Sequence, residues 1–197
     1  MTIVRVGIIG HSYVRDIASL GVTSGQISSD IQLEIRYYSK PGSCFDFWID
    51  FPHELHNCLH YNPHILFLSL GGNSIKETIR VKSLKEKADI LFEIIRNNLP
   101  HCKIVPIQVE CRFLTVTNRF GNPPYPRFKQ IRNKLNKAFQ QSKKRDFVCC
   151  IAGPNRLDAR KYFKSDGVHL NKAGLQKYLN QILRTVDYIY RVADLHI

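Results

Sequence analysis

Short apolar runs alternate along the chain with segments of helical periodicity. The apolar runs predict five buried strands: Ile3 to Ile9, Ile31 to Tyr38, His64 to Leu70, Lys103 to Val109 and Phe147 to Ala152. The periodic segments predict five helices: Tyr13 to Leu20, Phe51 to Leu59, Ser83 to Asn97, Arg127 to Gln141 and Lys172 to Tyr190. This alternation is typical of a three-layer α/β/α fold with a five-stranded parallel, doubly wound, flavodoxin-like sheet.

The fourth predicted helix is amphipathic. Its apolar residues recur at spacings of three and four: Phe128, Ile131, Leu135 and Phe139. Its polar remainder is strongly basic: Lys129, Arg132, Lys134 and Lys137. We expect one face of this helix to pack on the sheet and the other to present positive charge.

Composition favours one globular domain over residues 1–197. The chain is 44% apolar and shows no break in composition that would separate a second domain. Its longest mainly apolar run, Ile65 to Leu70, is far below the roughly 20 residues that span a bilayer, and the first residues lack a signal-peptide pattern. Six cysteines form no CxxC pair, which favours reduced thiols. We therefore expect a soluble, intracellular, cytoplasmic protein.

The formal net charge of +13 is concentrated in one part of the chain. Residues 112–164, here called the basic region, hold fourteen Lys or Arg residues against Asp146 and Asp158. Such a field attracts polyanions, whether RNA, DNA, anionic lipid or an acidic substrate. Composition alone does not choose between these partners.

The chemistry-bearing residues lie near the two ends of the chain. Asp166 and His169 have an Asp-x-x-His spacing, so one short loop carries both a general base and a group to orient it. Ser12 follows the first predicted strand, where a turn into a helix exposes a hydroxyl nucleophile and the N–H groups of a helix start. These residues predict a Ser-His-Asp hydrolase.

Two further segments offer donors for a developing oxyanion. Gly42 follows the second predicted strand, where the absence of a side chain lets a backbone N–H approach a substrate oxygen. Asn73 follows the third and offers a side-chain amide. Both fall at the same sheet edge as Ser12.

These segments resemble the four blocks of the SGNH (GDSL-like) hydrolase superfamily over Gly7 to Leu183. The resemblance implies that Ser12 is the nucleophile, His169 the base and Asp166 its partner. It also implies that the Ser12 N–H, Gly42 and Asn73 form the oxyanion hole. Two blocks depart from the usual pattern, since Gly10-His11-Ser12 replaces Gly-Asp-Ser and Gly71-Gly72-Asn73-Ser74 replaces Gly-x-Asn-Asp.

Within the superfamily, the basic surface and the Asp-Gly-Val-His-Leu-Asn ending are similar to the esterase domains encoded by retrotransposons. Function then has two interpretations. One is a serine esterase or lipase acting on a small ester or an acyl lipid. The other is a module that binds RNA or anionic lipid through the basic region, with phosphate contacts from Arg112, Arg119, Arg127, Lys129 and Arg132.

Cofactor and metal sites are weakly supported by the sequence. Gly7 and Gly10 lack the GxGxxG spacing of a dinucleotide fold. The histidines at positions 53, 56, 60 and 64 lack a carboxylate or cysteine that would complete a zinc site. We therefore expect neither a cofactor nor a metal.

Overall fold

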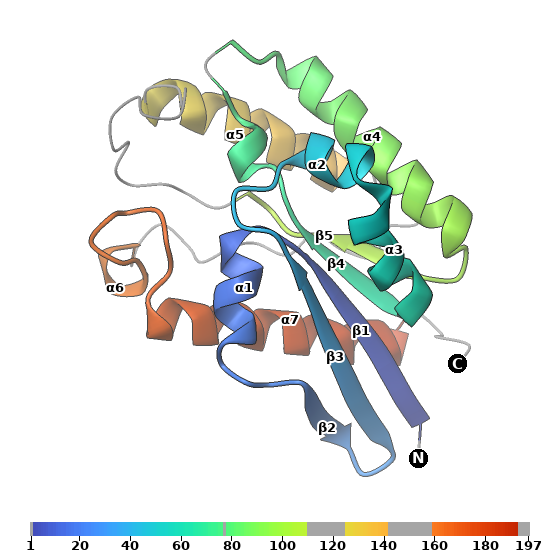
Figure 1. Ribbon diagram of the computed structural model, residues 1–197. Helices are drawn as coiled ribbons and strands as arrows, with labels where there is room; N and C mark the ends of the chain where they lie inside the picture. Colours follow the sequence, from blue (N-terminus) through green and yellow to red (C-terminus); the bar gives the residue numbers. More distant parts are fainter. Residues whose placement is uncertain (1, 77, 110–124, 142–158, 193–197) are drawn as a thin grey trace.

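The computed structural model describes residues 2–76, 78–109, 125–141 and 159–192, which form a five-stranded sheet flanked by helices (Figure 1). The sheet order is β2-β3-β1-β4-β5. The strands are β1 (Thr2–Gly10), β2 (Ser24–Ser28), β3 (Ile31–Ser39), β4 (Ile65–Ser69) and β5 (Lys103–Pro106). All neighbouring pairs are parallel except β2 and β3, which are antiparallel.

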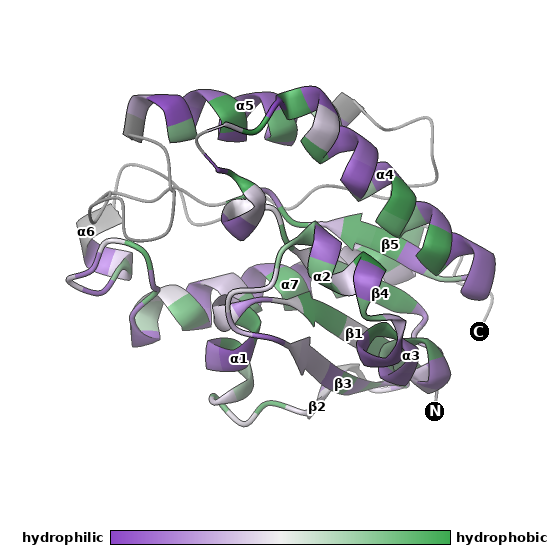
Figure 2. Ribbon diagram, turned by 45° about the horizontal axis from the view of Figure 1, so that its top comes forward, coloured by the Kyte–Doolittle hydropathy of each residue, from purple (hydrophilic) through white to green (hydrophobic). Residues whose placement is uncertain are grey.

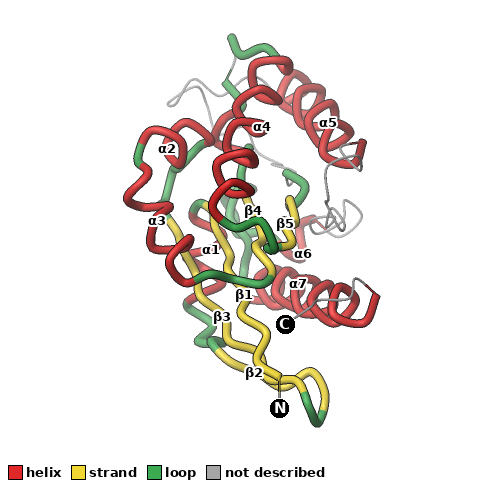
Figure 3. Tube along the Cα trace, turned by 90° about the vertical axis from the view of Figure 1, so that its right-hand side faces the viewer, coloured by secondary structure: helices red, strands yellow, loops and turns green. Residues whose placement is uncertain are grey.

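Helices cover both faces of the sheet. They are α1 (Ser12–Ala18), α2 (Phe45–Asp50), α3 (Pro52–Tyr61), α4 (Val81–Asn98), α5 (Tyr125–Gln141), α6 (Ala159–Tyr162) and α7 (Lys172–Val192), with a short 3₁₀ turn, η1 (Gly72–Ser74). Buried residues of α1 and α7 pack in one core, and those of α2 to α5 pack in the other. Figure 3 shows α7 and the α4–α5 pair on opposite sides of the strands.

The central strand β1 takes part in both cores because helices cover each of its faces. Val4, Val6 and Ile8 face the α1–α7 core, whereas Ile9 belongs to the opposite core. All four side chains are fully buried. In Figure 2 the central strands β1 and β4 and the edge strand β5 are coloured mainly as hydrophobic, whereas α4 and α5 also carry many hydrophilic positions. A parallel strand buried on both faces reads as a nearly continuous apolar run.

The predicted doubly wound α/β fold is confirmed, and four of the five predicted strands correspond to β1, β3, β4 and β5. The structure also has an antiparallel edge strand, β2, which was not predicted because Ser24–Ser28 is mostly polar and lacks an apolar alternation. The predicted strand Phe147 to Ala152 lies outside the described residues. The short helices α2 and α6 were also not predicted, since six and four residues are too few for a periodic signal.

The described cysteines carry free thiols. Cys58 is buried, and Cys44 and Cys102 are partly buried. Burial raises the pKa of the Cys58 thiol far above its ordinary value and that of Cys102 to about 12. These two thiols are therefore protonated at neutral pH and unreactive. Among the helices within the described residues, none has the length and apolar character needed to cross a bilayer.

Candidate active site

Three parallel strands end in register at the edge that carries the predicted site. Gly10, the last residue of β1, pairs with Ser39 of β3 on one side and with Ser69 of β4 on the other. The chain segments leaving these three ends carry Ser12, Gly42 and Asn73. The carboxyl edge of an open α/β sheet is where such folds place their ligand sites.

Ser12 is the first residue of α1 and is partly exposed. The turn before it requires glycine, because a Cβ on Gly10 would lie 2.5 Å from the Val14 Cγ2 and 2.7 Å from the Ser69 carbonyl oxygen. His11 caps the helix, and its Nδ1 accepts a hydrogen bond from the Tyr13 N–H at 3.5 Å. The N–H of Ser12 lies at the first position of α1, where the helix offers it no i−4 carbonyl partner.

Gly42 and Asn73 lie on the two neighbouring loops. Gly42 is exposed and has a φ of 77°, a left-handed conformation that favours glycine although a Cβ there would meet no atom within 4 Å. The Asn73 side chain donates from Nδ2 to the carbonyl oxygen of Ser43 at 3.2 Å. Its amide is thereby held beside the Gly42 loop.

Ser43 joins the three loops, a role that its sequence context did not predict. Its hydroxyl donates to the Gly10 carbonyl oxygen at 3.3 Å and accepts from the Trp48 Nε1 at 3.2 Å. Its backbone carbonyl accepts the Asn73 amide. Because Ser43 is only 4% exposed, all these polar groups are satisfied away from water. The only sequence signal was its position directly after Gly42.

Asp166 and His169 form the hydrogen bond that the Asp-x-x-His spacing predicts. The Asp166 Oδ2 lies 2.7 Å from the His169 Nδ1, and its Oδ1 accepts the N–H groups of Val168 and His169, each at 2.8 Å. Partial burial raises the pKa of Asp166, but these hydrogen bonds outweigh it, so the pKa lies below its ordinary value. An ionised Asp166 fixes a proton on Nδ1 and leaves Nε2 to accept one.

The structure brings the loop of Asp166 and His169 to the start of α1. The hydroxyl of Tyr13, the residue after Ser12, donates to the Val168 carbonyl oxygen. The rings of Tyr13 and His169 meet edge to face with their centroids 6.4 Å apart. No hydrogen bond joins the Ser12 hydroxyl to the His169 ring within the described residues, and catalytic hydrogen bonds are commonly longer before substrate binds.

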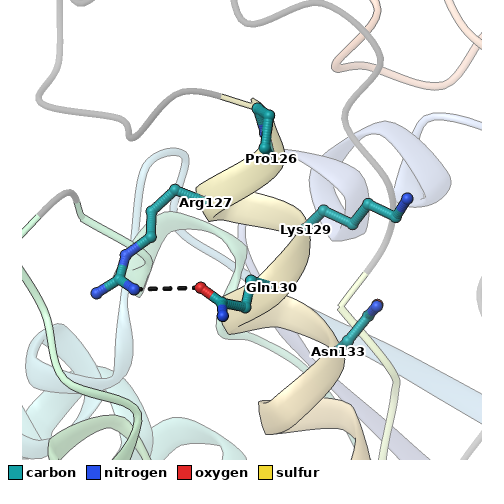
Figure 4. Close-up of a pocket in the computed structure, with 5 residues that line it drawn as sticks. All are labelled: Pro126, Arg127, Lys129, Gln130 and Asn133. Carbon is teal, nitrogen blue, oxygen red and sulfur yellow. Dashed lines mark hydrogen bonds between the residues drawn. The ribbon is translucent and has the colours of Figure 1, made fainter.

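The basic residues proposed to contact phosphates differ in location and exposure. Arg127 and Lys129 line a cavity of about 600 Å³ on α5 with Pro126, Gln130 and Asn133 (Figure 4). Figure 4 shows Arg127 joined to the Gln130 side chain, a hydrogen bond of 3.2 Å, with Lys129 extending on the other side of the helix.

Arg132 corrects the prediction of a wholly exposed basic face. It is 5% exposed, and its guanidinium donates to the Asn133 side chain at 2.6 Å. Arg132 follows Phe128 by four residues and precedes Leu135 by three, so it lies on the apolar stripe of α5. It is not available to a phosphate. Arg112 and Arg119 lie outside the described residues.

The histidine series on and after α3 does not form a metal site. Within residues 2–76, 78–109, 125–141 and 159–192, no three His, Cys, Asp or Glu side chains are grouped to hold an ion. The rings of His56 and His60 stack at 6.2 Å. His64 instead accepts the Arg5 N–H at its Nδ1, and burial followed by the Arg5 charge lowers its pKa.

Comparison with known protein families identifies the family to which this chain is related. Residues 29–177 match the GDSL-like Lipase/Acylhydrolase family. The chain belongs to this family. The match spans the Gly42, Asn73 and Asp166–His169 segments, so three of the four predicted blocks lie inside it. No curated protein sequence matches the chain.

Solved structures share the GDSL-like fold along almost the whole chain. A family 3 carbohydrate esterase of Clostridium thermocellum superposes with a TM-score of 0.67 at 16% identity, covering 98% of this chain and 100% of that one. A GDSL-like lipase candidate of Parabacteroides merdae gives 0.66 at 17% identity, covering 93% and 95%. A peptidoglycan O-acetylesterase gives 0.60 at 16% identity, covering 81% and 47%. At these identities the likeness shows the fold alone.

Proposed function

We propose that this GDSL-like chain is a serine esterase that hydrolyses carboxylic esters. The observation that carries the proposal is the Asp166–His169 hydrogen bond, on a loop bonded to the residue after Ser12. The alignment of the strand ends beneath Ser12, Gly42 and Asn73 supports it. A hydroxyl, an oriented base and convergent donors are the parts that acyl transfer needs.

The reaction proceeds in two steps. His169 accepts the hydroxyl proton of Ser12 at Nε2, while Asp166 holds Nδ1 and stabilises the imidazolium that forms. The Ser12 oxygen bonds to the ester carbonyl carbon, and the tetrahedral intermediate collapses as His169 returns the proton to the departing alcohol. Water, deprotonated by His169, then attacks the acyl-enzyme and releases the carboxylic acid and the Ser12 hydroxyl.

The oxyanion is stabilised by donors from three loops. The Ser12 N–H comes from the start of α1, the Gly42 N–H from the loop after β3, and the Asn73 amide from η1 after β4. Ser43 holds these loops at fixed separation through its contacts with Gly10 and Asn73. Preorganised donors of this kind need no rearrangement when charge develops.

The substrate that we propose is a small ester or an acyl lipid. Two structurally similar proteins are named as a carbohydrate esterase and a peptidoglycan O-acetylesterase. A short-chain p-nitrophenyl ester therefore serves as the first probe, because it shares the ester carbonyl and makes few other demands on the site.

Ester turnover with a serine-specific label tests the proposal. Wild type should hydrolyse p-nitrophenyl acetate, whereas Ser12→Ala should lose nearly all activity. A fluorophosphonate should modify one residue of the wild type, which peptide mass spectrometry should identify as Ser12. Equal rates for wild type and Ser12→Ala, or a label on another residue, would reject the esterase assignment.

A second function is proposed for the basic region, namely binding RNA or an anionic membrane surface. Its support is the concentration of positive charge there and the cavity on α5 beside exposed Arg127 and half-exposed Lys129. The two functions are compatible, because the cationic surface could bring the esterase to a ribonucleoprotein or to lipid. A retrotransposon origin stays a sequence-based prediction.

A further inference from the structure

We propose that Tyr13 is a positioning residue that holds the loop of Asp166 and His169 over Ser12. The proposal rests on the esterase function and adds a residue that neither the sequence pattern nor the family match assigns. The proposal has three requirements. Tyr13 must bind the loop, its own side chain must be held in place, and the loop must be rigid from the Val168 carbonyl to His169.

The contact of Tyr13 falls within the segment that matters for catalysis. Its hydroxyl donates to the carbonyl oxygen of Val168, which lies between Asp166 and His169 in the chain. Its ring also meets the His169 ring edge to face, with the two centroids 6.4 Å apart. One side chain thus fixes both the backbone before the base and the side of its ring.

The core holds Tyr13 in place. Tyr13 is 3% exposed, and its ring packs edge to face on Tyr178 of α7 at 6.4 Å. The Tyr178 hydroxyl in turn shares a hydrogen bond of 2.7 Å with the hydroxyl of Ser69, the last residue of β4. A side chain packed this closely has little rotamer freedom, so the position of its hydroxyl is set by the sheet and α7.

The loop is stiffened by its own backbone bonds. The Lys164 N–H donates to the His169 carbonyl oxygen at 2.7 Å, and the Gly167 N–H donates to the Lys164 carbonyl oxygen at 2.9 Å. Phe163 and Leu170 form an isolated antiparallel bridge at its base. Displacement of Val168 is therefore passed on to His169.

A weaker second tether joins the same helix to the same loop. The Lys164 ammonium lies 3.9 Å from the Asp16 carboxylate, three residues after Tyr13 on α1. Asp16 is mostly buried and is also bonded by Arg15 at 2.6 Å. Lys164 is half-exposed, so solvent screens this ion pair and the Tyr13 contact dominates.

Removing only the hydroxyl of Tyr13 tests the positioning role. Tyr13→Phe keeps the ring contacts but frees the loop, and a small misplacement of the base costs up to about 100-fold in rate. We expect kcat for p-nitrophenyl acetate to fall by about tenfold or more. KM should be unchanged, since Tyr13 touches the loop rather than the substrate.

Tyr61→Phe is the matched control. Tyr61 is also buried and also donates to a backbone carbonyl oxygen, that of Glu34, at 2.9 Å. Glu34 pairs with Arg5 near the amino end of β1, away from the strand ends that carry the site. This variant should keep the wild-type kcat. Lys164→Gln removes the second tether alone and should lower kcat by no more than about threefold, as expected for a screened ion pair.

Labelling to completion with a fluorophosphonate counts the active sites that are correctly folded. Dividing the measured rate by this number gives kcat per active site, which distinguishes a misplaced base from a loss of folded protein. A loss of labelled sites in Tyr13→Phe with an unchanged kcat per site would overturn the proposal and leave Tyr13 a structural residue. An unchanged kcat with full labelling would also overturn it. A wild type that neither turns over ester nor takes the label would instead reject the esterase function itself.

Discussion

At the scale of single residues, the proposed oxyanion donors give the most direct test of the proposed esterase chemistry. Asn73→Ala removes the side-chain amide and should lower kcat for p-nitrophenyl acetate by about 10²- to 10³-fold, the usual cost of losing one such donor. Asn98→Ala is the control, since the Asn98 amide also donates to a carbonyl oxygen, that of Ile94, on the exposed end of α4. Equal rates for Asn73→Ala and Asn98→Ala would exclude Asn73 from the oxyanion hole.

The depressed pKa of Asp166 gives a pH prediction with a definite sign. The ordinary pKa of this carboxyl is 3.8, and its value in the folded protein is lower. Ionised Asp166 therefore stabilises the fold fully above pH 3.8, and this contribution is lost as pH falls through the lower, folded value. Asp166→Asn lacks that dependence.

Thermal unfolding of both proteins between pH 2.5 and 7 measures the effect. The Tm of wild type should exceed that of Asp166→Asn at neutral pH, and the difference should shrink in acid. A difference that stays constant over the whole range would show that the Asp166 charge does not contribute to stability.

Ser43 is a single buried residue that connects the loops around the candidate site. Ser43→Ala leaves the buried Trp48 N–H without its hydroxyl partner and should lower the free energy of unfolding by about 1–3 kcal/mol. It should also lower kcat, because the Gly10 contact that aligns the Gly42 loop is lost.

Ser19→Ala is the comparison for Ser43→Ala in chemical denaturation. Ser19 is exposed and its hydroxyl donates to the Asp16 carbonyl oxygen at 2.6 Å, so its removal should change stability little. Similar unfolding free energies for the two variants would contradict the role given to Ser43.

At the scale of elements, the packing of α7 on α6 sets the position of the His169 loop between them. Gly174 lies in the first turn of α7, and a Cβ there would come 2.2 Å from the Tyr162 carbonyl oxygen and 3.1 Å from the Leu170 Cδ2. Gly174→Ala should therefore separate the two helices, cost about 1–3 kcal/mol of stability and lower kcat.

Gly25→Ala provides the matching control for Gly174→Ala. Gly25 lies in β2, where a Cβ would meet no atom within 4 Å, so the substitution should leave kcat unchanged. If Gly174→Ala retains wild-type Tm and kcat, the packing argument for the α6–α7 contact is wrong.

Elements were predictable in proportion to their length and burial. The boundaries expected for β3 and α7 differ from those observed by one or two residues, because each has a long, regular apolar pattern. The strand β2 was not predicted, because it forms through its pairing with β3 and its own side chains show no strand pattern. The first turn of α4 begins two residues before the predicted start at Ser83.

At the scale of the whole molecule, the uneven charge predicts salt-dependent binding. Single-stranded RNA affinity should fall steeply as salt rises, with a log–log slope that decreases by roughly 0.7 for each phosphate contact removed. Arg127→Gln combined with Lys129→Gln should therefore flatten the slope. Lys82 is an exposed side chain on α4 outside the basic region, so Lys82→Gln should leave the slope unchanged.

Fluorescence anisotropy with a labelled RNA measures both effects, and anionic vesicles without RNA serve as the alternative ligand. Absence of RNA binding at low salt would remove the RNA function, and vesicle binding alone would assign the charge to lipid. Neither result bears on the ester hydrolysis proposed for Ser12.

The sequence by itself determined the alternation of strands and helices and the succession of loops that carry Ser12, Gly42, Asn73, Asp166 and His169. These follow from local periodicity and from turn residues at the ends of strands, which act over a few positions. The Asp166–His169 hydrogen bond was predictable for the same reason, because three residues separate its partners.

Only the tertiary structure decided which distant groups meet. Ser43 joins three loops, and Tyr13 binds a carbonyl more than 150 residues away in the chain, neither of which leaves a local pattern. Packing also buried Arg132, whose charge had suggested an exposed position. Such contacts depend on how the sheet brings its strand ends together and on which helix face has a packing partner. Neither can be predicted from the type of a single residue.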